Sequence, residues 1–264
     1  MVCGYPLSHT QSPLLHNIVY RALNINYDFV AVESNDLEQI ITIIKNRPIE
    51  LTAITMPFKQ DILRYLDSCS PEVNQLKAAN TIIYRNGKLH GYNTDVDGIA
   101  YALQNISIFE KNILIIGAGG AARAFGFYAY EKNANLLWLN RSYKNALLLA
   151  HTFGGEVVNL ADINNIPLDI IINTTPIGMY PNVDVTPLPG YSFKQGQIVF
   201  DMVYNPMKTK LLKDVQNGNA RALSGFEMFI GQAMRQIELW THKEINRINL
   251  IDKIRSACQE ENEA

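Results

Sequence analysis

Apolar residues in the first 60 positions switch between helical and strand spacing. After a very short opening strand, Ser12 is expected to be the N-cap of a helix and Pro13 its first residue. Strands are predicted at Tyr27–Val32 and Leu51–Thr55, with a helix capped by Asp36 between them. This succession of strands and helices indicates a mostly parallel sheet.

The pattern changes between residues 81 and 92. Thr81–Tyr84 and Lys88–Tyr92 flank Asn86-Gly87, a pair typical of a tight type I′ turn. The segment therefore predicts an antiparallel hairpin at the end of the first α/β region. A domain boundary is expected near residues 93–100.

A second α/β region begins at Asn112 and ends in a long helical segment, with a turn expected around Asn217-Gly218. The elements predicted there are strands at Asn112–Ile116, Leu136–Leu139, Asp169–Asn173 and Ile198–Met202, and helices at Gly120–Glu131, 143–152 and Phe226–Trp240. We therefore expect an α/β protein of two domains, the first with a mostly parallel sheet plus a hairpin.

Composition narrows the function classes. The 264 residues are 47% hydrophobic and 18% charged, with a formal net charge of −2. That charge gives no reason to expect nucleic acid or a membrane surface as partner, and no apolar run approaches the ~18 residues of a membrane span. The three cysteines, Cys3, Cys69 and Cys258, form no CxxC pair and no metal-binding spacing. We expect a cytoplasmic protein without a metal site.

A glycine-rich segment follows the strand at Asn112–Ile116 and opens the next helix. Gly117 permits a tight turn, Gly119 allows a diphosphate to approach the backbone, and Ala122 allows close packing of helix and strand. The diphosphate is then stabilised by the helix N-terminus. The pattern predicts a Rossmann-like dinucleotide-binding domain, with a tight turn that binds no ligand as the alternative. The residues expected at the cofactor are Gly117, Ala118, Gly119, Gly120 and Ala121.

The end of the following strand indicates which dinucleotide binds. An enzyme that uses NAD is expected to have a carboxylate there, whereas this chain has Asn140, Arg141 and Ser142, with Lys144 close behind. A guanidinium suits the 2′-phosphate of NADP. NADP is therefore favoured, and the alternative is that Arg141 is an ordinary surface charge.

Two further residues are candidates for acid–base chemistry. Lys59 follows the end of a predicted strand, and Asp95 follows the hairpin. Reduction of a carbonyl by hydride requires a proton for the developing alkoxide, which a partly desolvated lysine can deliver while a carboxylate orients it. Considered alone, Lys59 also fits a solvated surface lysine and Asp95 a helix cap.

Taken in order, the motifs resemble those of the shikimate dehydrogenase family over nearly the whole chain. The segments that carry the resemblance are Pro6–Pro13, Thr55–Lys59, Ala79–Thr81, Asn93–Gly98, Gly117–Arg123, Asn140–Ser142, Asn173–Met179, Asp201–Pro206 and Gly225…Met228…Gln232. Each motif is weak by itself, whereas their joint order and spacing are specific.

The resemblance implies an NADP-dependent enzyme that interconverts 3-dehydroshikimate and shikimate in the biosynthesis of chorismate and aromatic amino acids. It implies a substrate domain at residues 1–95, completed by a helix at about 233–264, and an NADP-binding domain at 96–232. Lys59 and Asp95 are the implied catalytic residues, and the protein is expected to be a monomer or homodimer.

The resemblance also implies roles for other residues. Thr10 and Ser12 are expected to bind the substrate carboxylate. Contacts to the substrate hydroxyls or ring are expected from Thr55, Asn80, Asn93, Tyr204 and Gln232. Contacts to the cofactor ribose and nicotinamide are expected from Thr174, Thr175, Met202 and Gly225.

Five positions depart from the family's usual residues: Thr10 for Ser, Ala53 for Asn, Val96 for Gly, Asn145 for Arg and Ser224 for Asp. Thr10 narrows the expected carboxylate pocket by one methyl group. Asn145 removes an expected phosphate ligand, for which Lys144 is the nearest substitute. Neither Lys59 nor Asp95 is among the departures.

Two alternatives remain open from the sequence. The first is a quinate or dual quinate/shikimate dehydrogenase that uses NAD, which the methyl group of Thr10 and the Asn140-Arg141 pair disfavour. The second is a non-catalytic NADP-binding regulator, which would be expected to lack Lys59 or Asp95.

Overall fold

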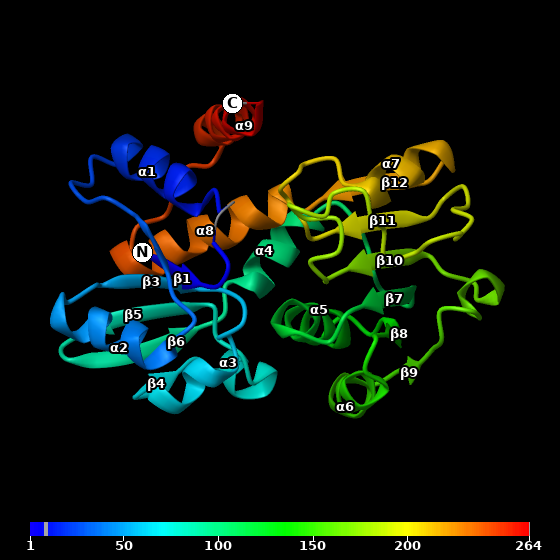
Figure 1. The fold of residues 1–264 in the computed structure, drawn as a ribbon, viewed down its shortest axis with the longest axis horizontal. Helices are drawn as coiled ribbons and strands as arrows, with labels where there is room; N and C mark the ends of the chain where they lie inside the picture. Colours follow the sequence, from blue (N-terminus) through cyan, green and yellow to red (C-terminus); the bar gives the residue numbers. More distant parts are fainter. Residues whose placement is uncertain (8–9, 264) are drawn as a thin grey trace. The chain divides into compact units, whose positions relative to one another are not determined.

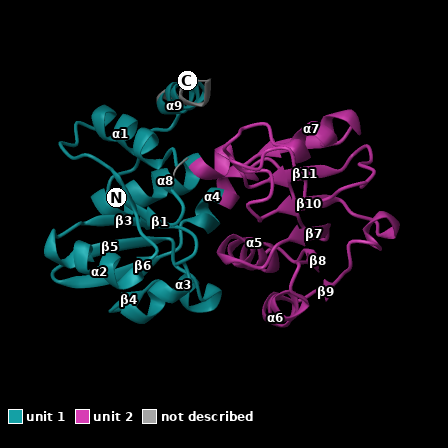
Figure 2. Ribbon diagram, in the orientation of Figure 1, with its two compact units in different colours: residues 1–98, 230–264 teal, residues 99–229 magenta. Residues whose placement is uncertain are grey.

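The chain forms two compact units, each with one six-stranded sheet (Figure 2). The computed structural model describes residues 1–7 and 10–263. Unit 1 comprises Met1–Gly98 and Ile230–Ala264, and unit 2 comprises Ile99–Phe229. Unit 1 is thus built from two separate stretches of chain.

The sheet of unit 1 has the order β2-β1-β3-β5-β6-β4, of which all strands but β2 are labelled in Figure 1. Its strands are β1 (Val2–Gly4), β2 (Ala31–Glu33), β3 (Leu51–Ile54), β4 (Ser68–Cys69), β5 (Thr81–Arg85) and β6 (Lys88–Tyr92). Strands β2, β1 and β3 are parallel, whereas β5 is antiparallel to both β3 and β6. The predicted hairpin is confirmed, and both turn residues, Asn86 and Gly87, have the positive φ that a type I′ turn requires.

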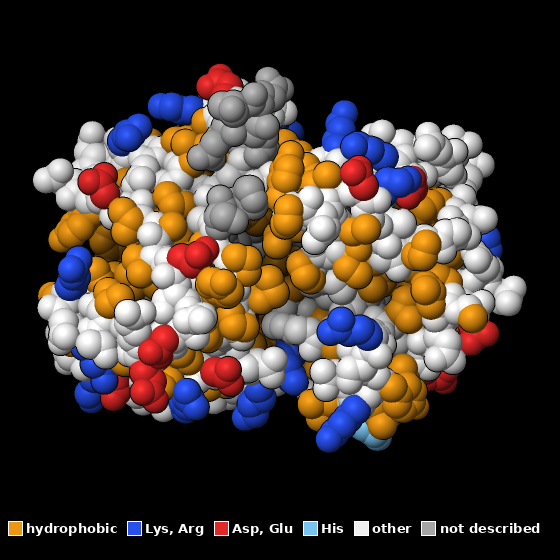
Figure 3. Space-filling model, in the orientation of Figure 1, with side chains coloured by type: hydrophobic (Ala, Val, Ile, Leu, Met, Phe, Trp, Pro, Cys, Tyr) orange, Lys and Arg blue, Asp and Glu red, His pale blue; other side chains and the backbone are white. Residues whose placement is uncertain are grey.

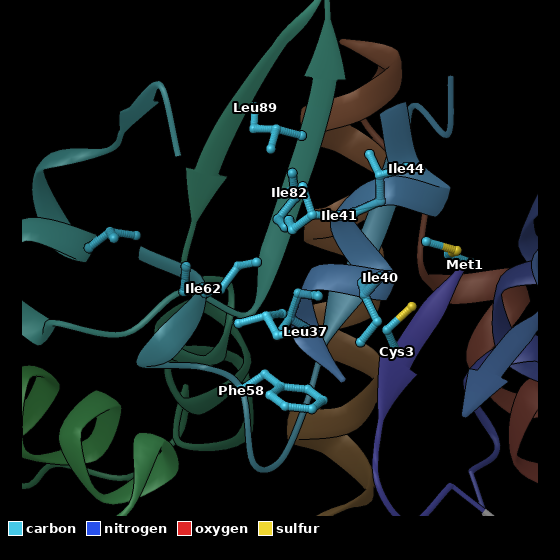
Figure 4. Packing of buried hydrophobic residues seen from close by; sticks show 13 residues of the cluster. Met1, Cys3, Leu37, Ile40, Ile41, Ile44, Phe58, Ile62, Ile82 and Leu89 are labelled. Carbon is cyan, nitrogen blue, oxygen red and sulfur yellow. The ribbon is translucent and has the colours of Figure 1, made fainter. Parts of the chain in front are cut away.

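Helix α2 (Leu37–Asn46) supplies much of the apolar core of unit 1. The carboxylate of Asp36 accepts hydrogen bonds from the backbone of Glu38 and Gln39, which confirms the predicted cap. Apolar residues of α2 pack against Ile82 and Leu89 of the hairpin (Figure 4). These α2 residues are Leu37, Ile40, Ile41 and Ile44.

Two predictions near the start of the chain were wrong in detail. The N-cap of α1 (Ser12–Ala22) is Gln11, and Ser12 is the first helical residue. The strand predicted at Tyr27–Val32 is shorter, because the side chain of Asn17 binds both the N–H and the carbonyl of Phe29 and keeps them out of the ladder. Strand β2 therefore begins only at Ala31.

The other helical segments of unit 1 are η1 (Asp61–Tyr65), α3 (Pro71–Leu76), α4 (Asp95–Ala102), α8 (Phe226–Thr241) and α9 (Ile248–Glu263). Helix α4 ends in residues of unit 2, and helix α8 begins in them. Helix α9 packs against α1, and the Gln11 side chain donates to the carbonyl of Cys258 at 3.0 Å. Residues from the end of the chain thereby join those from its beginning within one unit.

The sheet of unit 2 is entirely parallel, in the order β12-β11-β10-β7-β8-β9 (Figure 1). Its strands are β7 (Asn112–Ile116), β8 (Asn135–Leu139), β9 (Glu156–Val157), β10 (Ile170–Asn173), β11 (Ile198–Asp201) and β12 (Arg221–Ser224). Counted along the chain this is the order 3-2-1-4-5-6 of a dinucleotide-binding sheet. The strand order reverses between β7 and β10, where ligands bind in such sheets.

The helices of unit 2 follow the expected alternation. Helix α6 (Tyr143–Phe153) packs against β8 and α5 (Gly120–Tyr130), and α7 (Lys210–Asn217) packs against β11 and β12. The sequence pattern gave only a turn at Asn217-Gly218, which is the C-terminal end of α7, and it missed both α7 and β12. Short η2 (Ile163–Asn165) precedes β10.

The surface mixes charges of both signs, as a net charge of −2 allows (Figure 3). Across the described ranges 1–7 and 10–263, none of the helices has the length and apolarity needed to cross a bilayer.

Candidate functional site

Lys59 and Asp95, which are 36 residues apart in sequence, form an ion pair in unit 1. Lys59 lies in the turn after β3, and Asp95 is the first residue of α4. The ammonium nitrogen is 2.5 Å from Asp95 Oδ2, and the side chains are 19% and 6% exposed. The lysine is thus partly shielded, and its charge is balanced by a nearly buried carboxylate.

Buried amide and hydroxyl groups hold the carboxylate in place. The side-chain amino group of Asn80 donates to Asp95 Oδ1 at 2.9 Å, and the side-chain oxygen Oδ1 of Asn80 accepts from the backbone N–H of Thr94 at 2.8 Å. Asn93 accepts from the Asp95 N–H at 3.1 Å and donates to the Ala78 carbonyl. The structure therefore brings four residues from the predicted site together: Lys59, Asp95, Asn80 and Asn93.

The remaining predicted substrate residues of unit 1 lie on other segments. Thr10 and Ser12 are two residues apart, and the Ser12 N–H donates to Thr10 Oγ1 with an N···O distance of 3.4 Å. Ser8 and His9 of the same motif lie outside the described residues. Thr55 directly follows β3 and donates its N–H to Cys3, and Gln232 is a half-buried residue of α8.

In unit 2, the glycine turn after β7 meets the loop after β10. Gly117 has φ +115°, and a β-carbon there would collide with Thr174 Oγ1 and lie 3.0 Å from the methyl group of Thr175. Thr174 donates its hydroxyl and N–H to the Ile116 carbonyl at 2.7 and 2.9 Å. The predicted residues Gly117, Thr174 and Thr175 thus converge at the reversal of the strand order.

The start of α5 suits a phosphate group. Gly119 is the N-cap and contributes no side chain to the first-turn N–H groups, and this turn contains no acidic residue. A β-carbon at Gly119 would meet no atom within 4 Å. Open space beside exposed N–H groups at a helix N-terminus fits a dinucleotide diphosphate. Ala118, Gly120 and Ala121 complete this turn, partly exposed.

Sequence reasoning gave no role to the fully buried Asp201 at the end of β11. Asp201 accepts hydrogen bonds from Asn173 at 2.9 Å, from the Val203 N–H at 3.1 Å and from Thr209 at 2.6 Å. Burial raises the pKa of Asp201 to about 6, although these three donors oppose the rise. Asn173 in turn accepts from the Thr175 hydroxyl at 2.6 Å, so Asp201 supports the loop beside the glycine turn.

Three predicted residues follow β11 and β12. Met202 donates its N–H to the Asn173 carbonyl at 3.0 Å, and a β-carbon on the buried Gly225 would collide with the Met202 carbonyl. Tyr204 is half-buried and stacks on Phe229, with ring centroids 4.2 Å apart. Close backbone approach explains why glycine stands at 225.

The predicted 2′-phosphate residues cluster between β8 and α6. Asn140 donates its side chain to the Ser142 carbonyl at 3.0 Å, and Ser142 is the N-cap of α6. Arg141 and Lys144 are exposed. Both cations therefore lie next to a helix N-terminus and are available to an anionic ligand.

The sequence analysis gave no role to Gln236 or His16, although both join the hydrogen bonds around Asn80. Gln236 is 1% exposed and donates to Thr81, and its carbonyl lies 3.1 Å from His16 Nε2. One available signal was the spacing of Gln232 and Gln236, which places both on the same face of a helix.

The chain is similar to known proteins in sequence and in fold. Residues 2–82 match a family model described as the shikimate dehydrogenase substrate binding domain. An NADP(+) shikimate dehydrogenase of Methanocaldococcus jannaschii is 37% identical, over 95% of each chain.

Two solved structures are similar over almost the entire chain. A crystal structure of a shikimate dehydrogenase in complex with NADP+ has a TM-score of 0.90 at 34% identity, covering 98% of this chain and 94% of that one. The shikimate 5-dehydrogenase of Thermus thermophilus, in complex with NADP(H) and shikimate, has a TM-score of 0.87 at 30% identity, covering 97% and 98%. By its sequence and its fold, the chain belongs to the shikimate dehydrogenase family.

Proposed function

We propose that this protein is an NADP-dependent shikimate dehydrogenase that interconverts 3-dehydroshikimate and shikimate. The observation that carries the proposal is the Lys59–Asp95 ion pair, whose nearly buried carboxylate is held by Asn80, in a chain of this family. Such a pair is the acid–base equipment that carbonyl reduction requires.

Lys59 is the general acid of the proposed reaction. When bound, NADPH supplies the hydride that reduces the substrate carbonyl carbon. The ammonium of Lys59 gives a proton to the carbonyl oxygen as negative charge develops there, and takes it back in the oxidation of shikimate. Asp95 Oδ2 holds the ammonium in one position, because its other oxygen is fixed by Asn80.

The substrate is proposed to be held by short polar side chains of unit 1. Thr10 and Ser12 bind its carboxylate, and the contacts to its hydroxyls come from Thr55, Asn80, Asn93 and Gln232. The methyl group of Thr10 favours shikimate over quinate, which has an additional hydroxyl on the carbon that bears the carboxylate.

The cofactor is proposed to bind at the reversal of strand order in unit 2. The diphosphate is held by Gly117, Ala118, Gly119, Gly120 and Ala121. The 2′-phosphate is held by Asn140, Arg141, Ser142 and Lys144, and the ribose and nicotinamide by Thr174, Thr175, Met202 and Gly225.

All three cysteines are free in the structure, which supports the reducing setting of the cytoplasm.

The test is the absorbance of NADPH, measured with purified protein and each combination of shikimate or quinate with NADP+ or NAD+. Rapid reduction with shikimate and NADP+ alone is the expected result. Turnover with quinate or NAD+ would assign the protein to the alternative dehydrogenase. Tight binding of NADPH without turnover in any combination would identify a regulator.

A further inference from the structure

A continuous chain of hydrogen bonds leads from the Lys59–Asp95 pair to helix α8. The side-chain amino group of Asn80 donates to Asp95 Oδ1 at 2.9 Å, and the Thr81 hydroxyl donates to Asn80 Oδ1 at 2.8 Å. The side-chain amino group of Gln236 donates to the Thr81 hydroxyl at 3.1 Å. Asp95, Asn80, Thr81 and Gln236 are each at most 4% exposed. Water therefore offers these groups no substitute partners.

The direction of these hydrogen bonds is set at Thr81. Its hydroxyl has one proton, and three groups lie within its reach: Asn80 Oδ1 at 2.8 Å, the Gln236 amide at 3.1 Å and the Thr94 hydroxyl at 3.3 Å. Because Gln236 presents its amino group to Thr81, the hydroxyl proton goes to Asn80 Oδ1, the nearer of the two remaining acceptors. With its carbonyl so held, Asn80 directs its amino group to Asp95. If the Gln236 amide were flipped, its oxygen would accept the hydrogen bond from the Thr81 hydroxyl, and Asn80 Oδ1 would lose that bond.

His16 contacts Gln236 from the other side. The ring is fully buried and stacks on Phe29 with centroids 3.8 Å apart. Burial lowers the pKa of His16 to about 3, so at neutral pH the ring is neutral and has a single N–H. Its Nε2 lies 3.1 Å from Gln236 Oε1 and its Nδ1 lies 2.8 Å from the Ser12 carbonyl. Both facing atoms are acceptor oxygens, so a neutral ring donates either to the Ser12 carbonyl or to Gln236 Oε1 and cannot donate to both.

We propose that Gln236 is a positioning residue for the Lys59–Asp95 pair, acting through Thr81 and Asn80. Its predicted catalytic consequence rests on the proposed function, whereas its effect on Asn80 does not. The backbone N–H of Thr94 also donates to Asn80 Oδ1, at 2.8 Å. Loss of Gln236 therefore weakens the orientation of Asn80 without abolishing it.

The test uses two variants that interrupt the chain and one matched control. Gln236→Met removes the amide at similar length, and Thr81→Val removes only the hydroxyl in a side chain of nearly the same shape. Thr52→Val is the control, because Thr52 is equally buried on the adjacent strand β3 and its hydroxyl has no hydrogen-bond partner among the described residues. Thr81→Val decides the question if Gln236→Met does not fold.

The first readout is NMR of the Asn80 side-chain amide, recorded without substrate or cofactor. In Gln236→Met and Thr81→Val, its resonances should shift and its protons should exchange with water about threefold to tenfold faster, the factor expected for one neutral hydrogen bond. Thr52→Val should leave both unchanged. Wild-type behaviour of Asn80 in the two variants, or equal changes in Thr52→Val, would overturn the proposal.

The second readout is steady-state kinetics with shikimate and NADP+. A misplaced acid–base pair lowers kcat by about threefold to tenfold with little change in the KM for shikimate. A rise in KM at unchanged kcat would contradict a positioning role. If the wild-type protein shows no turnover, the proposed function fails, and the NMR result still decides whether Gln236 orients Asn80.

Discussion

The two units hold their candidate site residues by different means. In unit 1, Lys59, Asp95 and Asn80 are fixed by hydrogen bonds between side chains that are mostly buried. In unit 2, the turn at Gly117 and Gly119 leads to a helix N-terminus without a side-chain cap, and the cations Arg141 and Lys144 after β8 are exposed. The first site depends on the identity of each side chain, and the second depends on the path of the backbone.

This difference follows from the tasks proposed for each unit. Proton transfer requires one ammonium at one position, which a closed network of buried donors and acceptors provides. A diphosphate has many equivalent oxygens, for which a row of N–H groups at a helix N-terminus is sufficient. Substitutions should therefore affect turnover in unit 1, and stability or cofactor affinity in unit 2.

The largest effect is expected for Lys59→Ala, which removes the general acid. We expect kcat to fall about a thousandfold, within the range attributed to general acid–base catalysis, with NADP+ binding unchanged. Steady-state kinetics and a binding titration measure both. Lys59→Arg is the matched variant, since it keeps a positive charge beside Asp95 but does not release a proton. Near-native turnover of Lys59→Arg would show that only the charge matters.

Asp201→Asn should alter how stability depends on pH. The carboxyl of Asp201 titrates near 3.8 when unfolded, whereas burial raises its pKa to about 6 in the folded protein. The folded state therefore binds more protons between these values, and stability present below pH 3.8 is lost as pH rises through 6.

The loss is on the order of 3 kcal/mol, because the shift is about two units at roughly 1.4 kcal/mol each. Asp201→Asn lacks this titration, so its deficit relative to wild type should be larger at pH 4 than at pH 7. Urea unfolding at several pH values measures it. A deficit that does not vary with pH would contradict the raised pKa of the buried Asp201 carboxyl.

Arg141→Ala should raise the KM for NADP+ about tenfold and leave the KM for NAD+ nearly unchanged, since a charge-assisted contact to the 2′-phosphate is lost. The same assay on Lys144→Ala shows whether the second exposed cation at this helix start contributes. Equal increases in the KM for NADP+ and for NAD+ would mean that Arg141 does not contact the 2′-phosphate.

The smallest effect on stability is expected for Gly119→Ala. Its new methyl group enters open space, so the unfolding free energy should change by only about 0.5 kcal/mol while NADP+ affinity falls. Gly117→Ala is the contrasting variant, because φ +115° and the contact with Thr174 should cost about 1–3 kcal/mol. Thermal unfolding and a binding titration separate the two. Unchanged affinity in Gly119→Ala would place the diphosphate elsewhere.

The sequence predicted most of the elements whose signals are local. The hairpin around Asn86-Gly87, the Asp36 cap and the strand before Gly117 are confirmed, since each depends on a few neighbouring residues. The strand at Tyr27–Val32 was misjudged because the hydrogen bonds of Phe29 are made by Asn17, which lies 12 residues away.

The contacts around the site were less predictable for the same reason. The motif order supplied Lys59 and Asp95, yet their spacing of 36 residues did not reveal that they meet. Gln236 and Thr81 are 155 residues apart, and Asn173 and Asp201 are 28 apart on separate strands. Such partners are chosen by tertiary packing, which periodicity along the chain does not encode.

The division of unit 1 into Met1–Gly98 and Ile230–Ala264 has a consequence for synthesis on the ribosome. Translation at about 5–20 residues per second completes residues 99–229 before Gln236 is made. A nascent chain at that stage already contains Lys59, Asp95 and Asn80 but lacks most of helix α8, including Gln236. The order of translation thus makes unit 2 the first to have all of its residues, and the hydrogen-bond chain that supports Asn80 is completed later.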